Sequence, residues 1–217
     1  TKAMDLFAWL YDIEENLRKA PEKLFRVAEK AAARQGIRVR KLDMRHFDRD
    51  IELIKEAYNS AWERNWGFVP MTEHEIDHLA KSMKPVLDPN LIFIAETADG
   101  KPVGISLTLP DLHQALTWSG GHMWPFGLLK FLWHRRKVNQ MRLFIMGMKE
   151  QYRGRGIDAL FYLLTGQEGL KRGYTREEGS WILETNDMMN RILERLGGIK
   201  YKTYRIYEKS LLSGDRG

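Results

Sequence analysis

The stretch from Arg142 to Leu164 constrains the fold of this chain more than any other part of the sequence. It opens with an apolar run, Leu143 to Met148, which is typical of a buried strand. A basic segment with two glycines, QYRGRGI, follows at residues 151–157. Apolar residues then recur at positions 157, 160, 161 and 164, which lie on one face of a helix. The stretch therefore predicts a strand, a glycine-containing turn and a helix.

The predicted turn has the properties of an anion site. Gly154 and Gly156 lack Cβ atoms, so the backbone can approach a ligand closely. The first N–H groups of the following helix have no partner inside the helix and lie at the positive end of its dipole. Phosphate is the usual occupant of such a position, and Arg153 and Arg155 add positive charge beside it. The alternative is an ordinary strand-to-helix turn that is rich in glycine and arginine.

The pattern Gln151-x-x-Gly154-x-Gly156 after a hydrophobic strand resembles the acyl-CoA-binding motif of the GNAT superfamily of N-acyltransferases. The order of elements predicted from residue 37 to 209 resembles the same fold, so we expect an α/β protein with a mixed central sheet flanked by helices. The resemblance implies transfer of an acetyl or other acyl group from acyl-CoA to a primary amine. The acceptor and the acyl length are not specified. A CoA-binding module without turnover is the alternative.

The resemblance also assigns residues to the cofactor. Backbone groups at Met146 and Met148 would pair with the pantetheine arm, and Gly147 is a natural place for a bulge that separates this strand from the next. Both methionines can be core residues as well. Asn186 would contact the pantetheine side of CoA or cap a helix, and Asn favours both roles. The residues expected to cradle the pyrophosphate are Gln151, Arg153, Gly154, Arg155, Gly156 and Ile157.

The catalytic groups are less defined by the resemblance. Many family members have a Tyr seven residues after the Asn, where this chain has Leu193. Tyr201, Tyr204 or solvent would then protonate the departing thiolate. Glu184, at the end of a predicted strand, is the first candidate for the base that removes the ammonium proton, although it can also be a solvated strand-end carboxylate.

The acceptor is expected between the loop at residues 62–68 and an aromatic, basic insertion at residues 110–140. The insertion could cover an acyl chain, touch a membrane or form a dimer contact, and its short apolar stretch favours a lid or partner surface. Asp111 and His113 follow a predicted strand and are further candidates for the base or the acceptor site. The residues expected to form the opposite wall are Trp62, Asn65, Trp66 and Phe68.

Other elements follow from local patterns. Residues 48–64 are predicted to form a helix capped by Asp48 or Asp50, and residues 72–83 a second helix with a capping box. A hairpin is expected at residues 91–109 and a strand at 179–183. Residues 1–35 are predicted to be an appendage to a domain at 36–217. Their first segment resembles the last predicted strand, so it could be the end of a preceding, truncated domain of the same type.

Composition excludes some classes of protein. The chain has 217 residues, no cysteine, a net charge of +6 and a pI near 9.4. Disulfides and thiolate catalysis are therefore excluded, and a reducing, cytoplasmic location is expected. A basic chain suits a polyanionic cofactor such as acetyl-CoA; charge alone would fit nucleic acid equally, but no nucleic-acid partner is expected. No apolar run approaches the roughly 20 residues that span a bilayer.

One motif points to different chemistry. The segment from His74 to His78, HEIDH, matches the pattern of two zinc ligands with a Glu base. Its helix is mostly polar, which is typical of an exposed face, and Lys81 and Lys84 stand where the extended metalloprotease pattern has Gly and His. A zinc hydrolase is therefore a remote alternative, and no metal is expected.

Overall fold

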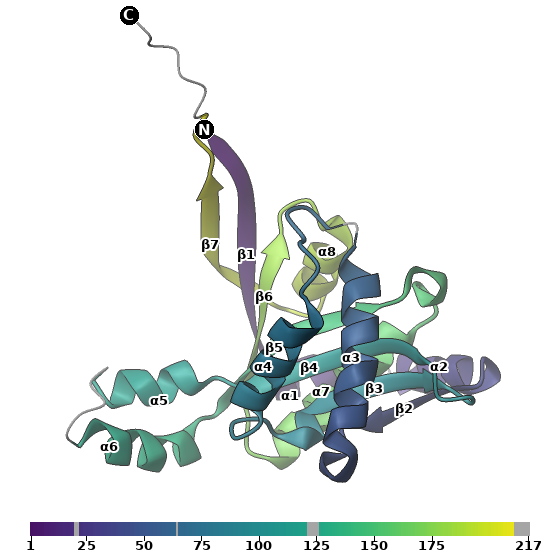
Figure 1. Ribbon diagram of the computed structural model, residues 1–217, viewed down its shortest axis with the longest axis horizontal. Helices are drawn as coiled ribbons and strands as arrows, with labels where there is room; N and C mark the ends of the chain where they lie inside the picture. The colour runs from purple at the N-terminus through teal and green to yellow at the C-terminus, as the bar shows by residue number, and fades with distance from the viewer. Residues whose placement is uncertain (20–21, 64, 121–125, 211–217) are drawn as a thin grey trace, which may run out of the picture.

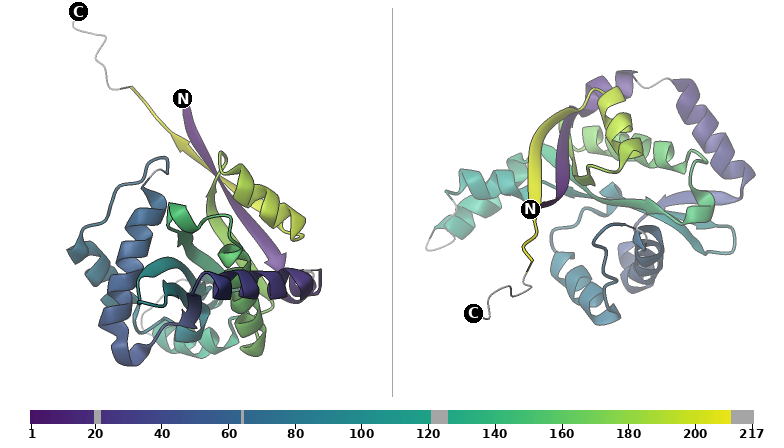
Figure 2. Two further views of the ribbon diagram at one scale, coloured as in Figure 1. Left: turned by 90° about the vertical axis from the view of Figure 1, so that its right-hand side faces the viewer. Right: turned by 90° about the horizontal axis from the view of Figure 1, so that it is seen from above.

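A single mixed sheet of seven strands forms the centre of the molecule (Figure 1). The computed structural model describes residues 1–19, 22–63, 65–120 and 126–210. Within these residues the strands are ordered β2-β3-β4-β5-β6-β1-β7, and only β5 and β6 pair in parallel. Helices α3 and α4 cover one face, and α1, α2, α7 and α8 lie on the other (Figure 2). The predicted α/β fold with a mixed, helix-flanked sheet is therefore confirmed.

The strands are β1 Lys2–Asp12, β2 Ile37–Lys41, β3 Ile92–Thr97, β4 Pro102–Pro110, β5 Gln140–Met148, β6 Arg176–Leu183 and β7 Ile199–Tyr207. The helices are α1 Ile13–Lys19, α2 Glu22–Arg34, α3 Phe47–Trp62, α4 Glu73–Met83, α5 Leu112–Trp118, α6 Gly127–His134, α7 Ile157–Lys171 and α8 Asp187–Arg195. Short 3₁₀ turns lie at Met44–His46, Pro89–Leu91, Arg135–Lys137 and Glu150–Tyr152.

Several local predictions are confirmed and one is wrong. The capping box that begins α4 is present: Thr72 accepts from the Glu75 N–H, and the Glu75 side chain accepts from the Thr72 N–H. Helix α3 instead begins at Phe47 after His46, which makes no side-chain cap bond, so neither Asp48 nor Asp50 is the cap. The predicted last residue of that helix, 64, lies outside the described residues. Helix α5, within the insertion, was not predicted.

The N-terminal segment is part of the same sheet. β1 lies between β6 and β7 and pairs antiparallel with both. Leu6 lies opposite Leu183 of β6, and Lys2 lies opposite Tyr207 of β7. Ala28 and Ala32 of α2 belong to the same buried cluster as Phe161 of α7. Residues 1–35 therefore complete this fold and do not form a separate appendage. An origin of β1 in a preceding domain stays a prediction.

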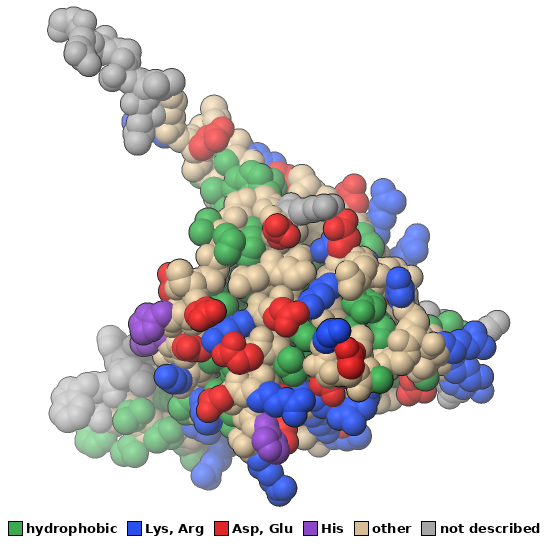
Figure 3. Space-filling view, turned by 45° about the vertical axis from the view of Figure 1, so that its right-hand side comes forward, with side chains coloured by type: hydrophobic (Ala, Val, Ile, Leu, Met, Phe, Trp, Pro, Cys, Tyr) green, Lys and Arg blue, Asp and Glu red, His purple; other side chains and the backbone are tan. Residues whose placement is uncertain are grey.

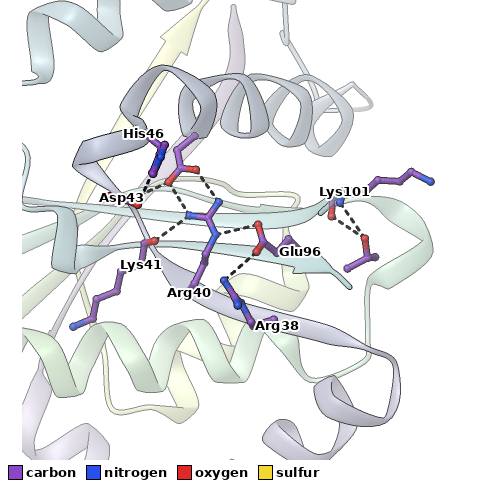
Figure 4. Close-up of polar contacts among 9 residues, drawn as sticks. Arg38, Arg40, Lys41, Asp43, His46, Glu96 and Lys101 are labelled. Atoms are coloured by element: carbon purple, nitrogen blue, oxygen red, sulfur yellow. Dashed lines mark hydrogen bonds and ion pairs between the residues drawn. The ribbon is translucent and has the colours of Figure 1, made fainter. Parts of the chain in front are cut away.

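A buried ionic cluster attaches α3 to the edge of the sheet (Figure 4). The Arg40 guanidinium on β2 donates to both carboxylate oxygens of Asp50 at 2.7 Å and to Glu96 on β3 at 3.0 Å. Asp50 also accepts from the Asp43 N–H at 2.8 Å. Asp50 and Glu96 are almost completely buried, and Arg40 lies close enough to compensate the charge of both carboxylates. The cluster fixes the position of α3, which forms one wall of the site described below.

Removal of Arg40 should therefore be costly. We expect Arg40→Met to lower the free energy of unfolding by about 3 kcal/mol or more, because it leaves the buried Asp50 without a cationic partner and Glu96 with only the exposed Arg38. Arg38→Met is the matched control: Arg38 is mostly exposed and lies 3.5 Å from Glu96, so its loss should cost less than about 1 kcal/mol. Urea unfolding measures both, and equal effects would contradict this assignment.

An apolar cavity of about 220 Å³ lies beneath α7 and α8, beside the buried carboxyl of Glu177 on β6. Burial raises the pKa of Glu177 to about 7, against a hydrogen bond from Tyr11 that lowers it. One of its oxygens has no hydrogen-bond partner among the described residues. Because the folded-state pKa lies above the ordinary value of 4.5, the folded chain binds this proton more tightly than the unfolded chain.

The pH dependence of stability follows from the direction of this pKa shift. Between pH 4.5 and about 7 the folded state holds a proton that the unfolded state has lost, so this group's contribution to stability falls as pH rises. In Glu177→Gln, the loss of stability from pH 4.5 to 8 should be smaller than in the wild type by about 3 kcal/mol. Urea unfolding at the two pH values measures the difference. Parallel pH profiles would show that Glu177 titrates normally.

Candidate active site

Two neighbouring parallel strands part halfway along their length and open a cleft. The β5–β6 ladder runs from Gln140 opposite Arg176 to Leu143 opposite Gly179 and ends there. The register of β5 against β4 shifts between Leu143 and Ile145, so Phe144 is the extra residue of a bulge. The predicted separation of these strands is therefore present. The prediction that Gly147 forms the bulge is wrong, because Gly147 pairs regularly with Ile105 of β4.

The cleft beyond the bulge consists of a cavity of about 470 Å³ and an adjoining one of about 120 Å³. Helix α3, the end of β5, the turn before α7 and the start of α8 line the larger cavity. The smaller one lies over Phe144 and the Ser180–Leu183 segment of β6. The residues common to both are Trp62, Asn65, Met146, Leu183, Asn186 and Met189.

Gly147 has a different role from the predicted one. A Cβ at this position would lie 2.4 Å from the indole ring of Trp62, so the absence of a side chain lets α3 pack directly against β5. Trp62 in turn stacks on Tyr58, whose ring meets that of Phe68 edge to face. Of the residues predicted to form the acceptor wall, Trp62, Asn65 and Trp66 line the cleft. Phe68 does not line it and instead packs against Tyr58.

The predicted glycine-containing turn between β5 and α7 is present. Gly154 and Gly156 both have positive φ, 68° and 85°, and Gly156 directly precedes the first residue of α7. Gly154 lines the larger cavity, and no atom lies within 4 Å of where its Cβ would be. The N-terminal N–H groups of α7, beginning at the buried Ile157, follow this turn. The half-buried Asp158 also lines the cavity and brings one negative charge to it.

The two arginines of the turn have different partners. Arg153 lines the cavity and donates to the carbonyl oxygens of Ala61 at 2.8 Å and Met148 at 3.3 Å, so it joins α3 to β5. The Arg155 guanidinium lies away from the cleft, where it donates to Gln35 at 2.8 Å. Gln151 is exposed and does not line either cavity. A phosphate contact by Arg155 or Gln151 stays a prediction that requires these side chains to move.

Asn186 caps a helix and lies at the cleft, and its contact with CoA stays a prediction. Its side chain accepts from the Met189 N–H at 3.2 Å and caps α8, and it lines both cavities. Leu193, seven residues later, is fully buried against the backbone of Gly179 and Gly198. The position of the family Tyr therefore belongs to the core in this chain.

The first candidate base is not at the cleft. Glu184 accepts from the Lys2 ammonium at 2.7 Å and the Asp5 N–H at 3.0 Å, and these bonds hold its pKa below the ordinary value. It lines neither cavity. Asp111 caps α5 and accepts from Gln140, and His113 is exposed, so both lie at the base of the insertion rather than in the cleft. The geometry does not support roles in catalysis for these three.

A polar cluster that the sequence did not reveal lies where the strands part. Ser180, which lines the smaller cavity, donates to the buried Glu178 and accepts from Arg142 Nε at 3.0 Å. The predicted acid Tyr201 donates to the other oxygen of Glu178. Burial favours a higher pKa of Glu178, but the bonds from Ser180 and Tyr201 and the charge of Arg142 outweigh it and lower the pKa. Burial and Glu178 raise the pKa of Tyr201, so Tyr201 keeps its proton.

The residues of the zinc motif have other roles. Glu75 caps α4, and Asp77 accepts from Lys55 at 2.6 Å. His74 and His78 are exposed. No group of three possible metal ligands occurs among the residues that the structure describes. No described helix is long and apolar enough to cross a membrane.

Comparison with known proteins gives relatives and a fold. No family model matches the chain. It is 38% identical, over 97% of its length, to the bacterial ceramide synthase of Caulobacter vibrioides, of which it covers 55%. It is 34% identical, over 97% of its length, to protein YghO of Escherichia coli, of which it covers 54%. The chain thus spans about half the length of these curated relatives.

Among solved structures, a GCN5-related N-acetyltransferase from Sphaerobacter thermophilus matches 94% of this chain and 51% of its own, with a TM-score of 0.62 and 18% identity. The chain has the GNAT fold. The opening between β5 and β6 is the strand separation that the resemblance implied, and the bulge beside it is at Phe144 rather than at Gly147. Within this GNAT fold, β1 of the N-terminal segment occupies the sheet position between β6 and β7.

Alanine substitutions at two matched glycines test whether CoA approaches the backbone of the turn before α7 closely. Gly154 and Gly173 both have positive φ and open space at Cβ, but only Gly154 lines the cleft. Gly→Ala at either position should cost about 1 kcal/mol of stability. Only Gly154→Ala should weaken CoA binding, by about tenfold or more, because loss of one hydrogen bond to a charged group has that size. Isothermal titration with CoA measures this. Equal affinity in the two variants would exclude the turn as the phosphate site.

Proposed function

We propose that this chain carries an acyltransferase site that moves an acyl group from acyl-CoA to the primary amine of a long-chain amino alcohol. The observation that carries the proposal is the cleft between β5 and β6, with the glycine turn and the N-terminus of α7 at its end. The similarity to a ceramide synthase supports the class of acceptor, because a ceramide is the N-acyl product of such an amine.

The surface of the cleft supports an apolar substrate. Four large apolar side chains that line it are exposed to solvent although they stand beside a cavity; they are Trp66, Phe144, Trp181 and Met188. Exposed apolar side chains gathered around an opening mark a binding site for an apolar group. Phe144 and Trp181 stand on the two separating strands, next to the polar cluster at Ser180. An alkyl chain could cover these rings while its amine reaches that cluster.

The reaction follows from the geometry of the strands. The neutral amine attacks the thioester carbonyl, a C–N bond forms, the C–S bond breaks and CoA leaves as the thiolate. Backbone N–H groups on β5 past Leu143 no longer pair with β6, and would stabilise the negative charge on the carbonyl oxygen. The proton released by the nitrogen passes to a base. Glu178, reached through the Ser180 hydroxyl, is ionised at neutral pH and is placed to accept it.

Glu178 and Glu184 are competing candidates for the base, and the same substitution at each position distinguishes them. Glu178→Gln keeps the shape of the side chain and removes the base, so kcat should fall by about 100-fold with little change in the KM for acyl-CoA. Glu184→Gln makes the same chemical change at a group that contacts Lys2 and the Asp5 N–H outside both cavities, and it should leave kcat within about twofold. Release of free CoA measures both. The reverse pattern would restore Glu184 as the base.

The acceptor class is tested with an amine panel. The purified protein is incubated with one acyl donor, palmitoyl-CoA or acetyl-CoA, and with one amine. The amines are a long-chain 2-amino alcohol, ethanolamine and spermidine. Mass spectrometry identifies the amide product. We expect the amide of the long-chain amino alcohol with palmitoyl-CoA. Turnover with spermidine or ethanolamine alone would contradict the proposal of a lipid acceptor, while the proposed acyltransferase activity would stand.

The second candidate is a CoA-binding module without turnover. The observation that favours it is Leu193, fully buried where many GNAT members have the Tyr that protonates the leaving thiolate. Tight CoA binding with no amide product from any amine would support this alternative. Product formation that is lost in Tyr201→Phe would instead assign the proton donor to Tyr201, which the Glu178 contact holds in place.

A further inference from the structure

The insertion between β4 and β5 forms a helical hairpin that extends away from the body of the molecule (Figure 1). We call α5, α6 and the turn Arg135–Lys137 the arm; residues 121–125, between the helices, lie outside the described part. Gln114 and Asn139 exchange two hydrogen bonds of 3.1 Å at its base, and the rings of Trp118 and His134 meet at 5.8 Å between the helices. The arm is therefore an ordered element.

The outer surface of the arm is apolar. Phe126 is 68% exposed, Leu129 65% and Trp133 56%. Leu128 and Leu132 are exposed as well, and helical periodicity puts these five on one continuous side of α6. Gly127 and Phe131 take the opposite, inner side. Figure 3 shows the hydrophobic side chains gathered at the lower left, over the arm. A patch of this kind marks an interaction surface.

The charged residues on α6 and directly after it are all basic. Lys130, Arg135, Arg136 and Lys137 are exposed on or directly after α6. No acidic residue occurs in the sequence from Leu112 to Lys149. The Lys137 ammonium lies 3.7 Å from the ring centre of Trp133, so charge and apolar surface are directly adjacent. An amphipathic helix with Leu, Phe and Trp on one side and Lys and Arg beside them is the pattern that binds the interface of an anionic bilayer.

We propose that the arm docks this protein on an anionic lipid surface, with the exposed side of α6 inserted at the headgroup level. The two occupants expected from sequence, an acyl chain under a lid or a second copy of the chain, have less support. None of the described residues of the arm lines the cleft, so a lid over the substrate is not formed here. A second copy would place four positive charges against the same four charges at a symmetric contact, which repels.

The docking proposal does not depend on the proposed acyltransferase function, because binding to vesicles requires no turnover. It is tested by co-sedimentation of the 217-residue chain with vesicles of phosphatidylcholine alone or with one third phosphatidylglycerol. We expect binding to the anionic vesicles to be at least about tenfold tighter and to weaken as salt is raised, since each basic residue near such a surface adds about 1 kcal/mol.

Two sets of variants and a control make the test specific. The double variant Leu129→Asp with Trp133→Asp should abolish binding to both kinds of vesicle. Neutralising Arg135 and Arg136 with Gln should remove the preference for anionic lipid. Val27→Asp, which changes an exposed apolar residue on α2, should bind as the wild type does. Circular dichroism confirms that the variants fold.

Two results would overturn the proposal. The first is that the wild-type protein fails to sediment with anionic vesicles at low salt. The other is concentration-dependent dimerisation, measured by analytical ultracentrifugation, that the Leu129 and Trp133 substitutions abolish while vesicle binding is unchanged. The second result would assign the arm to a contact between copies of the chain.

Discussion

The separation of β5 from β6 is the constraint on which the rest of the site depends. Backbone N–H and C=O groups are strong hydrogen-bonding groups, and burying them without a partner costs about as much as a lost hydrogen bond. A parallel ladder that ends at Leu143 and Gly179, in the middle of the sheet, therefore creates a position where an extended ligand can take the place of a strand. The bulge at Phe144 produces this opening, and the glycine turn at the end of β5 places a helix N-terminus at one end of it.

The surrounding packing keeps the opening in place. Trp62 can lie directly on β5 only because residue 147 is glycine, and the ion cluster of Arg40, Asp50 and Glu96 holds α3 in the required position. On the other side, β1 completes the sheet beyond β6, so that β6 keeps a hydrogen-bonded neighbour where it leaves β5. The cleft therefore depends on the whole sheet, including β1 at the start of the sequence.

Local signals predicted what depends on local sequence. The capping box of Thr72 and Glu75 specified a helix start, and the glycines at 154 and 156 specified a turn before a helix, because both depend only on neighbouring residues. Contacts between distant segments could not be predicted in this way. Glu184 was expected to be the base or a solvated strand-end carboxylate, but it forms an ion pair with Lys2, which is 182 residues away in the sequence. Glu178 was missed because the predicted strand began at Gly179, whereas β6 begins at Arg176 and includes this buried acid.

Hydrogen–deuterium exchange with and without CoA tests the central claim most directly. If the ligand takes the place of a strand between β5 and β6, CoA should slow exchange of backbone amides in residues 144–148, in the turn and first residues of α7, and in residues 181–189. The edge strand β2 and the arm should exchange at unchanged rates. Saturating CoA that protects none of these segments, or that protects only the helices around the Glu177 cavity, would contradict the account.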